Sequence, residues 1–387
     1  MDYFNFEEGM NILPKSDIVE SGLLNGMLTN FSASYKIYWL KGIFTEVVYK
    51  NNAQISYKKI IARMIAVAWY PVIYYKLSLG HADKLSDAIH YVHNSLGISR
   101  EEKEENIVNF VNNCMDPKLK TMIDDFTSNV PYRLIRPFYQ EQLAYEKKNN
   151  PDFREYKTDV LIEQFNRSDK SAFYMLNDKE EYLTVSREWI YYLKLNAPII
   201  EGWMNYKLID YVQRRNPNVP AVPLKLFPPT DKDRNLSAET KFWTEIQKEI
   251  PLYDIYTETE FTEKNFRENG GLSIDHFIPW SFVRHNEIWN LYPMFRNANS
   301  SKNNKLPDKE LYLNSFCEKQ YQAFMVAKNW KRDKKLMDQY LHVKEDIFQI
   351  DGSDRGHEVF LLAMKQTIEP LYQIARNQGY HVWQEEN

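Results

Sequence analysis

The chain has 387 residues, which is long enough for two or more domains with a sizeable hydrophobic core. Apolar residues make up 43% and charged residues 26%, and the formal net charge of −4 argues against a protein that binds polyanions over its whole surface. The two cysteines, Cys114 and Cys317, lie outside any C-x-x-C pair, so we expect no disulfide framework and no zinc ribbon. This cysteine usage favours a reducing cytoplasm.

We expect neither an export signal nor a membrane span. The first nine residues, M-D-Y-F-N-F-E-E-G, are acidic and lack the cationic region of a signal peptide. The most apolar run, residues 60–75, contains Arg63 and Pro71 and is too short to cross a bilayer. We therefore predict a buried core helix at this position.

Residues 1–230 are predicted to form a large, mainly helical domain. Ser32 is a candidate N-cap for its first helix, and Ser99 with Glu102 fits a capping box ahead of another. No metal-ligand or nucleophile constellation occurs in this region, so we expect it to regulate the protein or to bind a partner or substrate. The apolar periodicity predicts helices at 32–49, 56–70, 156–166, 182–195 and 199–214.

Residues 216–235 contain five prolines and are predicted to form a stiff, extended linker between two domains. The second domain, residues 236–387, has helical apolar stripes on both sides of a short region with strand character. The predicted fold class is therefore mainly α, with a large helical N-terminal domain followed by an α+β domain.

Residues 272–307 contain five polar residues whose spacing predicts a functional site. Asp275 and His276 are adjacent, Asn290 follows His276 by fourteen residues, Asn299 comes nine later, and Lys302 lies three beyond that. This pattern predicts a strand that ends at the Asp-His pair, a second strand that begins near Asn290, and a short helix near Asn299. Such a ββα finger would bring these side chains to one site.

The side chains match the needs of phosphodiester hydrolysis, which are an activated water and positive charge at the phosphate and the leaving oxygen. A single hard cation meets the second need when a few oxygen ligands hold it and leave room for phosphate and water. Asp275 offers a carboxylate and Asn299 a carboxamide oxygen, so we predict both as metal ligands. His276 is the predicted general base, because neutral imidazole exists at pH 7.

The remaining polar residues are predicted to support the finger or to bind substrate. Asn290 is expected to hydrogen-bond across the hairpin and to hold the loop that aims His276. Lys302, one helical turn after Asn299, is expected to meet a phosphate oxygen. By contrast, His285 and Asn286 in the inter-strand loop are predicted to be exposed to solvent.

Basic residues gather around the finger. Ten lysines and arginines stand against four acidic residues between positions 296 and 335, a local charge of +6 in a chain whose total is −4. Arg296 and Lys305 lie at the start of this run and are predicted to bind the phosphate backbone of nucleic acid.

The stretch resembles the HNH (ββα-metal) endonuclease superfamily and is most similar to the metal finger of the RNA-guided type II CRISPR nuclease, whose D-H…N…N…K…P spacing it shares. The resemblance covers residues 250–310. It implies one Mg²⁺ or Mn²⁺ ion bound by Asp275 and Asn299, with His276 as general base and Asn290 as the structural asparagine. The chain is also similar to bacterial HNH proteins with a helical N-terminal region, some of which act in defence against phage and plasmids.

Many proteins of this superfamily hold the finger with cysteine pairs on a structural zinc ion. The corresponding positions here are Phe295 and Ala298, and the upstream pair expected near Asp254 is missing as well. We therefore expect no structural zinc and a finger supported by apolar packing, with Phe295, Trp280 and Trp289 as candidates.

Two functions stay open at this point. The first is a metal-dependent endonuclease that prefers DNA to RNA and is controlled by a regulatory protein partner, by homo-oligomerisation or by a signal sensed through residues 1–230. The alternative is a nucleic-acid-binding subunit of a larger complex with an inactive finger. The intact Asp-His pair favours the first. A purely helical scaffold would leave the motif and the basic run unexplained.

Overall fold

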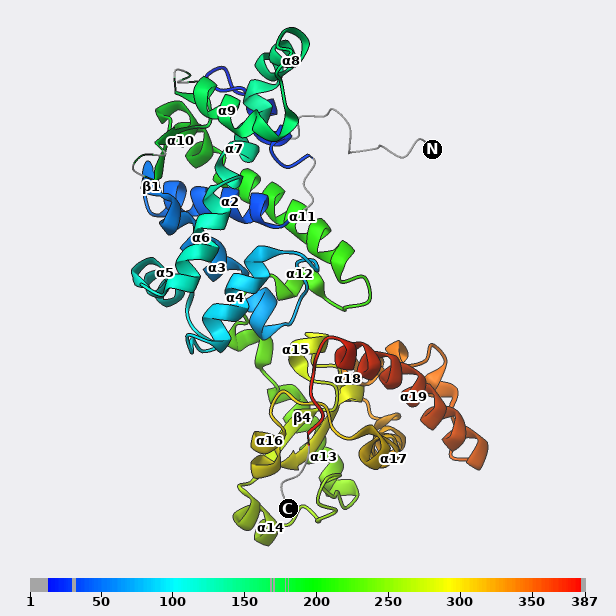
Figure 1. The fold of residues 1–387 in the computed structure, drawn as a ribbon. Coiled ribbons are helices and arrows are strands. Elements are labelled where there is room, and N and C mark those ends of the chain that lie inside the picture. The colour runs from blue at the N-terminus through cyan, green and yellow to red at the C-terminus, as the bar shows by residue number, and fades with distance from the viewer. Residues whose placement is uncertain are drawn as a thin grey trace, which may run out of the picture. The chain divides into compact units, whose positions relative to one another are not determined.

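The computed structural model describes residues 13–29, 33–167, 169, 171–177, 179 and 181–383. The chain forms two compact units, Met1–Pro217 and Asn218–Asn387 (Figure 1). Both are mainly helical, which confirms the predicted fold class. The expectations for the first nine residues and for Ser32 as an N-cap lie outside the described residues. Among the described helices, none is long and apolar enough to span a membrane.

Unit 1 is a helical body with one small antiparallel sheet of order β1-β3-β2. Its elements are α1 (Ser21–Gly26), α2 (Tyr35–Phe44), η1 (Thr45–Tyr49), β1 (Gln54–Ser56), α3 (Tyr57–Trp69), η2 (Tyr70–Tyr74), α4 (Lys84–Asn94), α5 (Glu104–Asn113), α6 (Pro117–Thr127), α7 (Val130–Ile135), η3 (Arg136–Tyr139), α8 (Gln140–Asn149), η4 (Glu155–Lys157), α9 (Thr158–Asn166), β2 (Tyr174–Asn177), β3 (Tyr182–Val185), α10 (Arg187–Leu195) and α11 (Ala197–Arg215).

The core of unit 1 is built around α3, the predicted central helix. Ser56 caps it by accepting a hydrogen bond from the Lys59 N–H at 3.2 Å. The helix packs between α2 and α5 and buries Arg63, whose guanidinium pairs with Glu46 at 2.7 Å. A buried arginine is tolerated here because carboxylates satisfy its donors. Pro71 lies in η2, a π-helical turn that follows α3.

Two local predictions in unit 1 are wrong. The helix expected at 182–195 begins only at Arg187, because residues 182–185 form β3 between the other two strands, with Leu183 opposite both Ile55 and Leu176. The expected capping box of Ser99 and Glu102 is absent, since α5 begins at Glu104. At β3, pairing with distant strands outweighs local propensity. At Ser99, the side chain accepts from the N–H of Glu101 rather than from that of Glu102.

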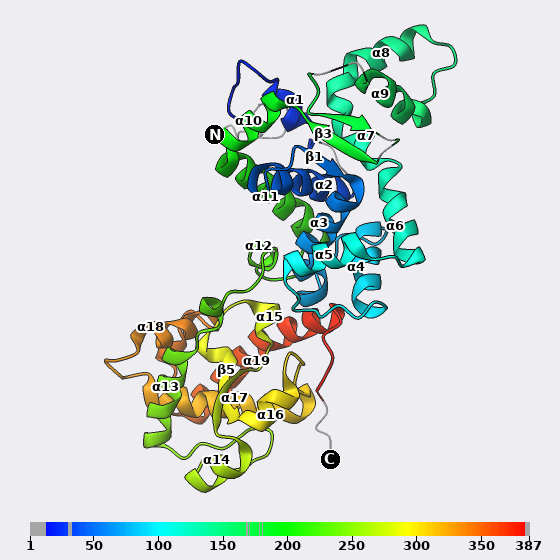
Figure 2. The same cartoon turned by 90° about the vertical axis from the view of Figure 1, so that its left-hand side faces the viewer.

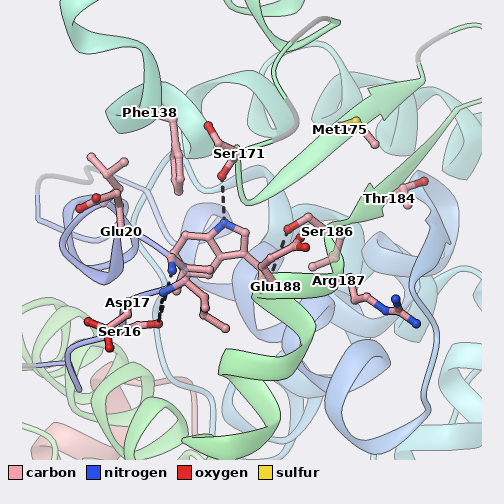
Figure 3. A pocket seen from close by; sticks show the side chains of 15 residues that line it. Ser16, Asp17, Glu20, Phe138, Ser171, Met175, Thr184, Ser186, Arg187 and Glu188 are labelled. Carbon is pink, nitrogen blue, oxygen red and sulfur yellow. Dashed lines mark hydrogen bonds between the residues drawn. The ribbon is translucent and has the colours of Figure 1, made fainter.

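A surface pocket of unit 1 lies beside β3 and the first turn of α10 (Figure 3). Its polar groups serve the local backbone: Ser16 Oγ accepts from the N–H groups of Ile18 and Val19, and Ser186 Oγ accepts from the N–H of Trp189. The charged residues on its wall are of both signs, so the pocket indicates no particular ligand. They are Asp17, Glu20, Arg187 and Glu188.

Unit 2 contains the two-stranded sheet of β4 and β5 and the helices around it (Figure 2). Its elements are α12 (Val222–Lys225), η5 (Asp231–Arg234), α13 (Ser237–Glu249), α14 (Glu263–Asn269), β4 (Leu272–His276), α15 (Trp280–Val283), η6 (Ile288–Asn290), β5 (Leu291–Phe295), α16 (Arg296–Lys302), α17 (Lys309–Ala327), α18 (Lys334–Met337), η7 (Asp338–His342), η8 (Ile347–Gln349) and α19 (Asp354–Asn377).

The proline-rich segment is not the extended linker that its composition predicts. Residues 218–235 belong to unit 2 and form the short helices α12 and η5. Pro223 is accommodated in the first turn of α12, where a missing N–H costs nothing. Thr230 and Asp233 close η5 with a capping box, in which the Thr230 N–H donates to Asp233 Oδ2 at 2.9 Å. The segment is therefore folded onto unit 2.

Lys225 ends α12 and is fully buried beside Phe282, with its Nζ 4.9 Å from the ring centroid. Within the described part of the chain its Nζ has no hydrogen-bond partner. Burial, assisted by the positive charge of Arg284, lowers the pKa of Lys225 from 10.5 to about 7. The folded chain therefore holds this proton less tightly than the unfolded chain does.

Lys225→Met should raise the free energy of unfolding at pH 7 by about 1–3 kcal/mol, because the methionine removes a buried, unsatisfied ammonium group. In the parent protein Lys225 makes stability rise from about pH 7 toward pH 10.5, where the unfolded chain binds more protons. Urea unfolding across this range should show that the variant lacks this contribution. Lys232→Met, at an exposed position of the same segment, is the matched control. Equal pH dependence in parent and variant would contradict the assignment.

Candidate active site

The β4–β5 hairpin and α16 form the ββα arrangement that the spacing predicts. The strands are antiparallel, with Asp275 opposite Tyr292 and His276 opposite Leu291. All five residues of β5 are buried, and the hairpin packs on both α13 and α16. Side chains alternate along a strand, so Asp275 shares one face of β4 with Ser273 while His276 points to the other.

Asn299 lies over the Asp275 face of β4. Its Nδ2 donates a hydrogen bond to Ser273 Oγ at 2.6 Å, two residues before Asp275 on the same face. Since the amide nitrogen is engaged there, the carboxamide oxygen is the atom of Asn299 that remains to serve as a ligand. The structure thus places the two predicted metal ligands on one side of the hairpin.

We expected Lys302 to reach outward to a phosphate, because it lies one helical turn after Asn299, but the side chain points inward. The same spacing puts it on the inner face of α16, where it is fully buried. Its ammonium forms an ion pair with Asp275 Oδ2 at 2.8 Å and donates to the backbone oxygen of His276 at 3.0 Å. The prediction of a substrate-binding role is corrected accordingly: Lys302 supports the Asp-His pair from inside the fold.

Burial acts on both members of the Asp-His pair. It raises the pKa of Asp275, and the adjacent Lys302 ammonium opposes that rise. It lowers the pKa of His276 to about 3, although a hydrogen bond with Asn286 acts in the opposite direction. The imidazole is therefore neutral at physiological pH, the form that a general base requires.

Asn290 makes the hydrogen bonds expected of it. It is fully buried, its Oδ1 accepts from the Ile278 N–H at 2.8 Å, and its Nδ2 donates to the Ile278 oxygen at 2.9 Å. These bonds fix the chain just after His276 to the start of β5. Asn290 thus acts on the position of His276 through the backbone.

Asn286 was missed as a site residue. It was expected in solvent, but it is half-buried and its Oδ1 lies 3.1 Å from His276 Nε2. The sequence gives no signal for this contact, because a single asparagine in a loop has no periodicity or motif to mark it.

Asp254 occupies the place where a zinc-binding pair was considered. Its fully buried carboxylate accepts hydrogen bonds from the N–H groups of Phe295 at 2.7 Å, Tyr256 at 2.8 Å and Thr257 at 3.1 Å. Phe295 in turn packs edge-on against Phe261, with ring centroids 5.0 Å apart. The end of β5 is therefore held by both a carboxylate and the apolar packing that we expected.

Asp254→Ala should lower the free energy of unfolding by about 2–4 kcal/mol, because three backbone N–H groups lose a charged acceptor inside the fold. Chemical unfolding followed by tryptophan fluorescence measures the change. Glu268→Ala, an exposed carboxylate in the neighbouring helix α14, should change stability by less than about 0.5 kcal/mol. If the two variants lose equal stability, the Asp254 contacts do not hold β5.

Arg296 and Lys305, the other predicted substrate contacts, are both exposed; Arg296 begins α16 and Lys305 lies three residues after its end. Farther along the basic run, Lys331, Lys334 and Lys335 are also exposed, and Arg332 pairs with Glu245 at 3.2 Å. The exposed charges other than that of Arg332 are thus available to an anionic partner, which is what a role in backbone binding requires.

Comparison with known proteins agrees with this geometry: residues 254–308 match the HNH endonuclease family. Unit 2 carries an HNH endonuclease domain. The matched residues run from Asp254 through both strands and α16, so they include every predicted ligand and base. The HNH domain indicates nuclease activity on nucleic acid. No curated protein and no solved structure matches the chain.

HNH nucleases generally use a divalent metal ion, and the residues of this domain fit one. In the described residues no group of three or more His, Cys, Asp and Glu side chains is placed to hold a metal. The predicted donor set is smaller, with one carboxylate from Asp275 and one carboxamide oxygen from Asn299. Hard oxygen donors of this kind suit Mg²⁺ or Mn²⁺, and a short protein ligand set leaves positions for water and phosphate.

Proposed function

We propose that the HNH domain is a metal-dependent endonuclease that hydrolyses DNA, with His276 as general base and with Asp275 and Asn299 as ligands of one Mg²⁺ or Mn²⁺ ion. The observation that carries the proposal is the environment of His276. Burial lowers the pKa of its ring to about 3, and Asn286 holds the ring by a hydrogen bond. The preceding residue, Asp275, is a carboxylate on the face of β4 over which the proposed ligand Asn299 lies.

The residues divide the chemistry among them. A divalent cation held by Asp275 and Asn299 would neutralise charge on the phosphate and on the leaving oxygen. His276 accepts the proton of the attacking water at the ring nitrogen that does not face Asn286. The Lys302 ammonium favours the charged form of Asp275, because it opposes the rise that burial causes in the pKa of this carboxyl.

Arg296 and Lys305 support a polyanionic substrate, because they flank α16 with their charges exposed. The test incubates the full chain in Mg²⁺ with supercoiled plasmid, linear duplex DNA, single-stranded DNA and single-stranded RNA. Nicked or linear plasmid is the expected product. Cleavage of RNA alone would contradict the DNA preference, whereas Arg296→Gln and Lys305→Gln should raise KM for DNA and make it less dependent on salt.

As part of the same proposal, unit 1 regulates the nuclease activity of the HNH domain. An unrestrained nuclease in the cytoplasm would damage the cell's own DNA, and unit 1 offers a large helical body outside the HNH domain. A regulatory protein, a second copy of the chain or a signal from invading phage or plasmid DNA would release the activity. If the purified full chain degrades plasmid at a high constant rate without any addition, this part of the proposal fails.

One observation favours a second candidate, a nucleic-acid-binding protein with an inactive finger. In this structure the negative charge of Asp275 is already balanced by the ammonium group of Lys302, which forms an ion pair with it. Calorimetric titration with Mn²⁺ separates the two, because an active finger binds the ion and loses binding in Asn299→Ala, whereas an inactive one shows no binding in either protein.

A further inference from the structure

Asn286 connects the general base to the proline-rich segment at the start of unit 2. The residue lies between α15 and η6, and its Oδ1 is 3.1 Å from His276 Nε2. On its other side, Nδ2 donates to the backbone oxygens of Asn235 at 3.3 Å and of Asp233 at 3.5 Å. One amide thus touches both the catalytic ring and residues about fifty positions earlier in the chain.

These contacts decide which way the amide faces. Backbone oxygens only accept hydrogen bonds, so the NH₂ group of Asn286 must face Asp233 and Asn235, and its oxygen must face His276. An amide oxygen also only accepts, so His276 must donate from Nε2. The neutral ring is then the Nε2–H tautomer, with the lone pair on Nδ1.

The carbonyl groups that fix Asn286 are themselves held in place. The capping box of Thr230 and Asp233 closes η5 just before them. Arg284, from the same loop as Asn286, donates to Asp233 Oδ2 at 3.4 Å and lies over Trp280, with its guanidinium 4.2 Å from the ring centroid. Arg234 lies over the same ring at 4.9 Å. This segment is therefore docked on the inter-strand loop by charge and by cation–π contacts.

We propose that Asn286 is a positioning residue that couples the segment 233–235 to the catalytic ring by selecting the Nε2–H tautomer of His276. The inference rests on the proposed role of His276 as general base. Displacement of the segment removes the two carbonyl acceptors, so the amide loses its fixed orientation and Nδ1 is no longer reserved for the attacking water. Segment 233–235, in the first part of unit 2, is thereby a point at which displacement of the chain would change the orientation of His276.

The test compares the wild-type full chain with Asn286→Leu, which keeps the shape of the side chain and removes both polar groups. Ring nitrogens of ¹⁵N-histidine-labelled protein report the tautomer, and the His276 signals are identified by their absence from His276→Gln protein. In the wild type we expect a protonated Nε2 and an unprotonated Nδ1. In Asn286→Leu we expect a mixture of tautomers and a kcat about 10- to 100-fold lower, with little change in KM.

Two further variants sharpen the experiment. Asp233→Ala removes the capping box and the Arg284 contact, and should shift the tautomer in the same direction as Asn286→Leu. Asn314→Leu, at an exposed position of α17, should leave both tautomer and kcat unchanged.

A wild-type ring protonated at Nδ1 would overturn the inference, and so would a loss of kcat in Asn286→Leu without any change of tautomer. The nitrogen spectra require no cleavage. They therefore test Asn286 separately from the proposed nuclease activity, whose own failure appears as an absence of cleavage by the wild type.

Discussion

His276→Ala should lower the rate of DNA cleavage by about 100- to 10,000-fold, because it removes the imidazole that we propose takes the proton of the attacking water at the strand end. Binding should be retained, since the charges of Arg296 and Lys305 are untouched. Cleavage of supercoiled plasmid in Mg²⁺, followed by gel electrophoresis, measures the rate. The affinity for duplex DNA is measured in Ca²⁺ in place of Mg²⁺, so that the DNA is bound without being cleaved.

The matched control is His81→Ala, at an exposed position of unit 1. It should cleave at the wild-type rate. Thermal unfolding of both variants shows whether either substitution disturbs the fold. If folded His276→Ala protein keeps more than a tenth of the wild-type rate, His276 is not the general base.

Lys302→Met should lower the free energy of unfolding by about 3–5 kcal/mol, because it leaves the Asp275 carboxylate buried without its partner. Lys302 is fully buried and spans α16 and β4 through Asp275 and the His276 carbonyl. The variant should also lose activity, since the backbone that carries the Asp-His pair loses a support. Urea unfolding measures the stability.

A double-mutant cycle separates this ion pair from simple loss of packing. Asp275→Asn combined with Lys302→Met should be more stable than the sum of the single effects predicts, by about 2 kcal/mol. Lys305→Met, at an exposed position three residues later, should change stability by less than about 0.5 kcal/mol. Additive effects in the cycle would refute a direct coupling between Asp275 and Lys302.

The sequence predicts the finger well because its information is local. The Asp-His pair, Asn290 and Asn299 lie within one hairpin and one helix, so their spacing determines where each side chain falls. The hydrogen bonds of Asn290 and the order of strands and helix are present as predicted. The mainly helical fold class also follows from periodicity alone.

What the sequence does not predict depends on contacts between distant residues. The Asp254 carboxylate meets the Phe295 N–H across 41 positions, and Asn286 meets Asn235 across 51. Lys302 was expected to meet a phosphate oxygen because its helix position fits that contact as well as a buried one. Only the packing of α16 on β4 decides between the two. Strand β3 was likewise predicted to be helical, because only its pairing with β1 identifies it as a strand.

The measurement that tests the central claim most directly is cleavage of supercoiled plasmid by the purified full chain in Mg²⁺, in Mn²⁺ and in EDTA. Asp275→Asn protein is assayed under the same conditions. A parallel series adds extract of phage-infected or plasmid-bearing cells to supply a trigger. With the extract present we expect nicked or linear DNA in either metal, none in EDTA, recovery when Mg²⁺ is added back, and none with the variant; without the extract the rate should be low. Cleavage that persists in EDTA, or that Asp275→Asn protein performs at the wild-type rate, would contradict a metal-dependent HNH nuclease.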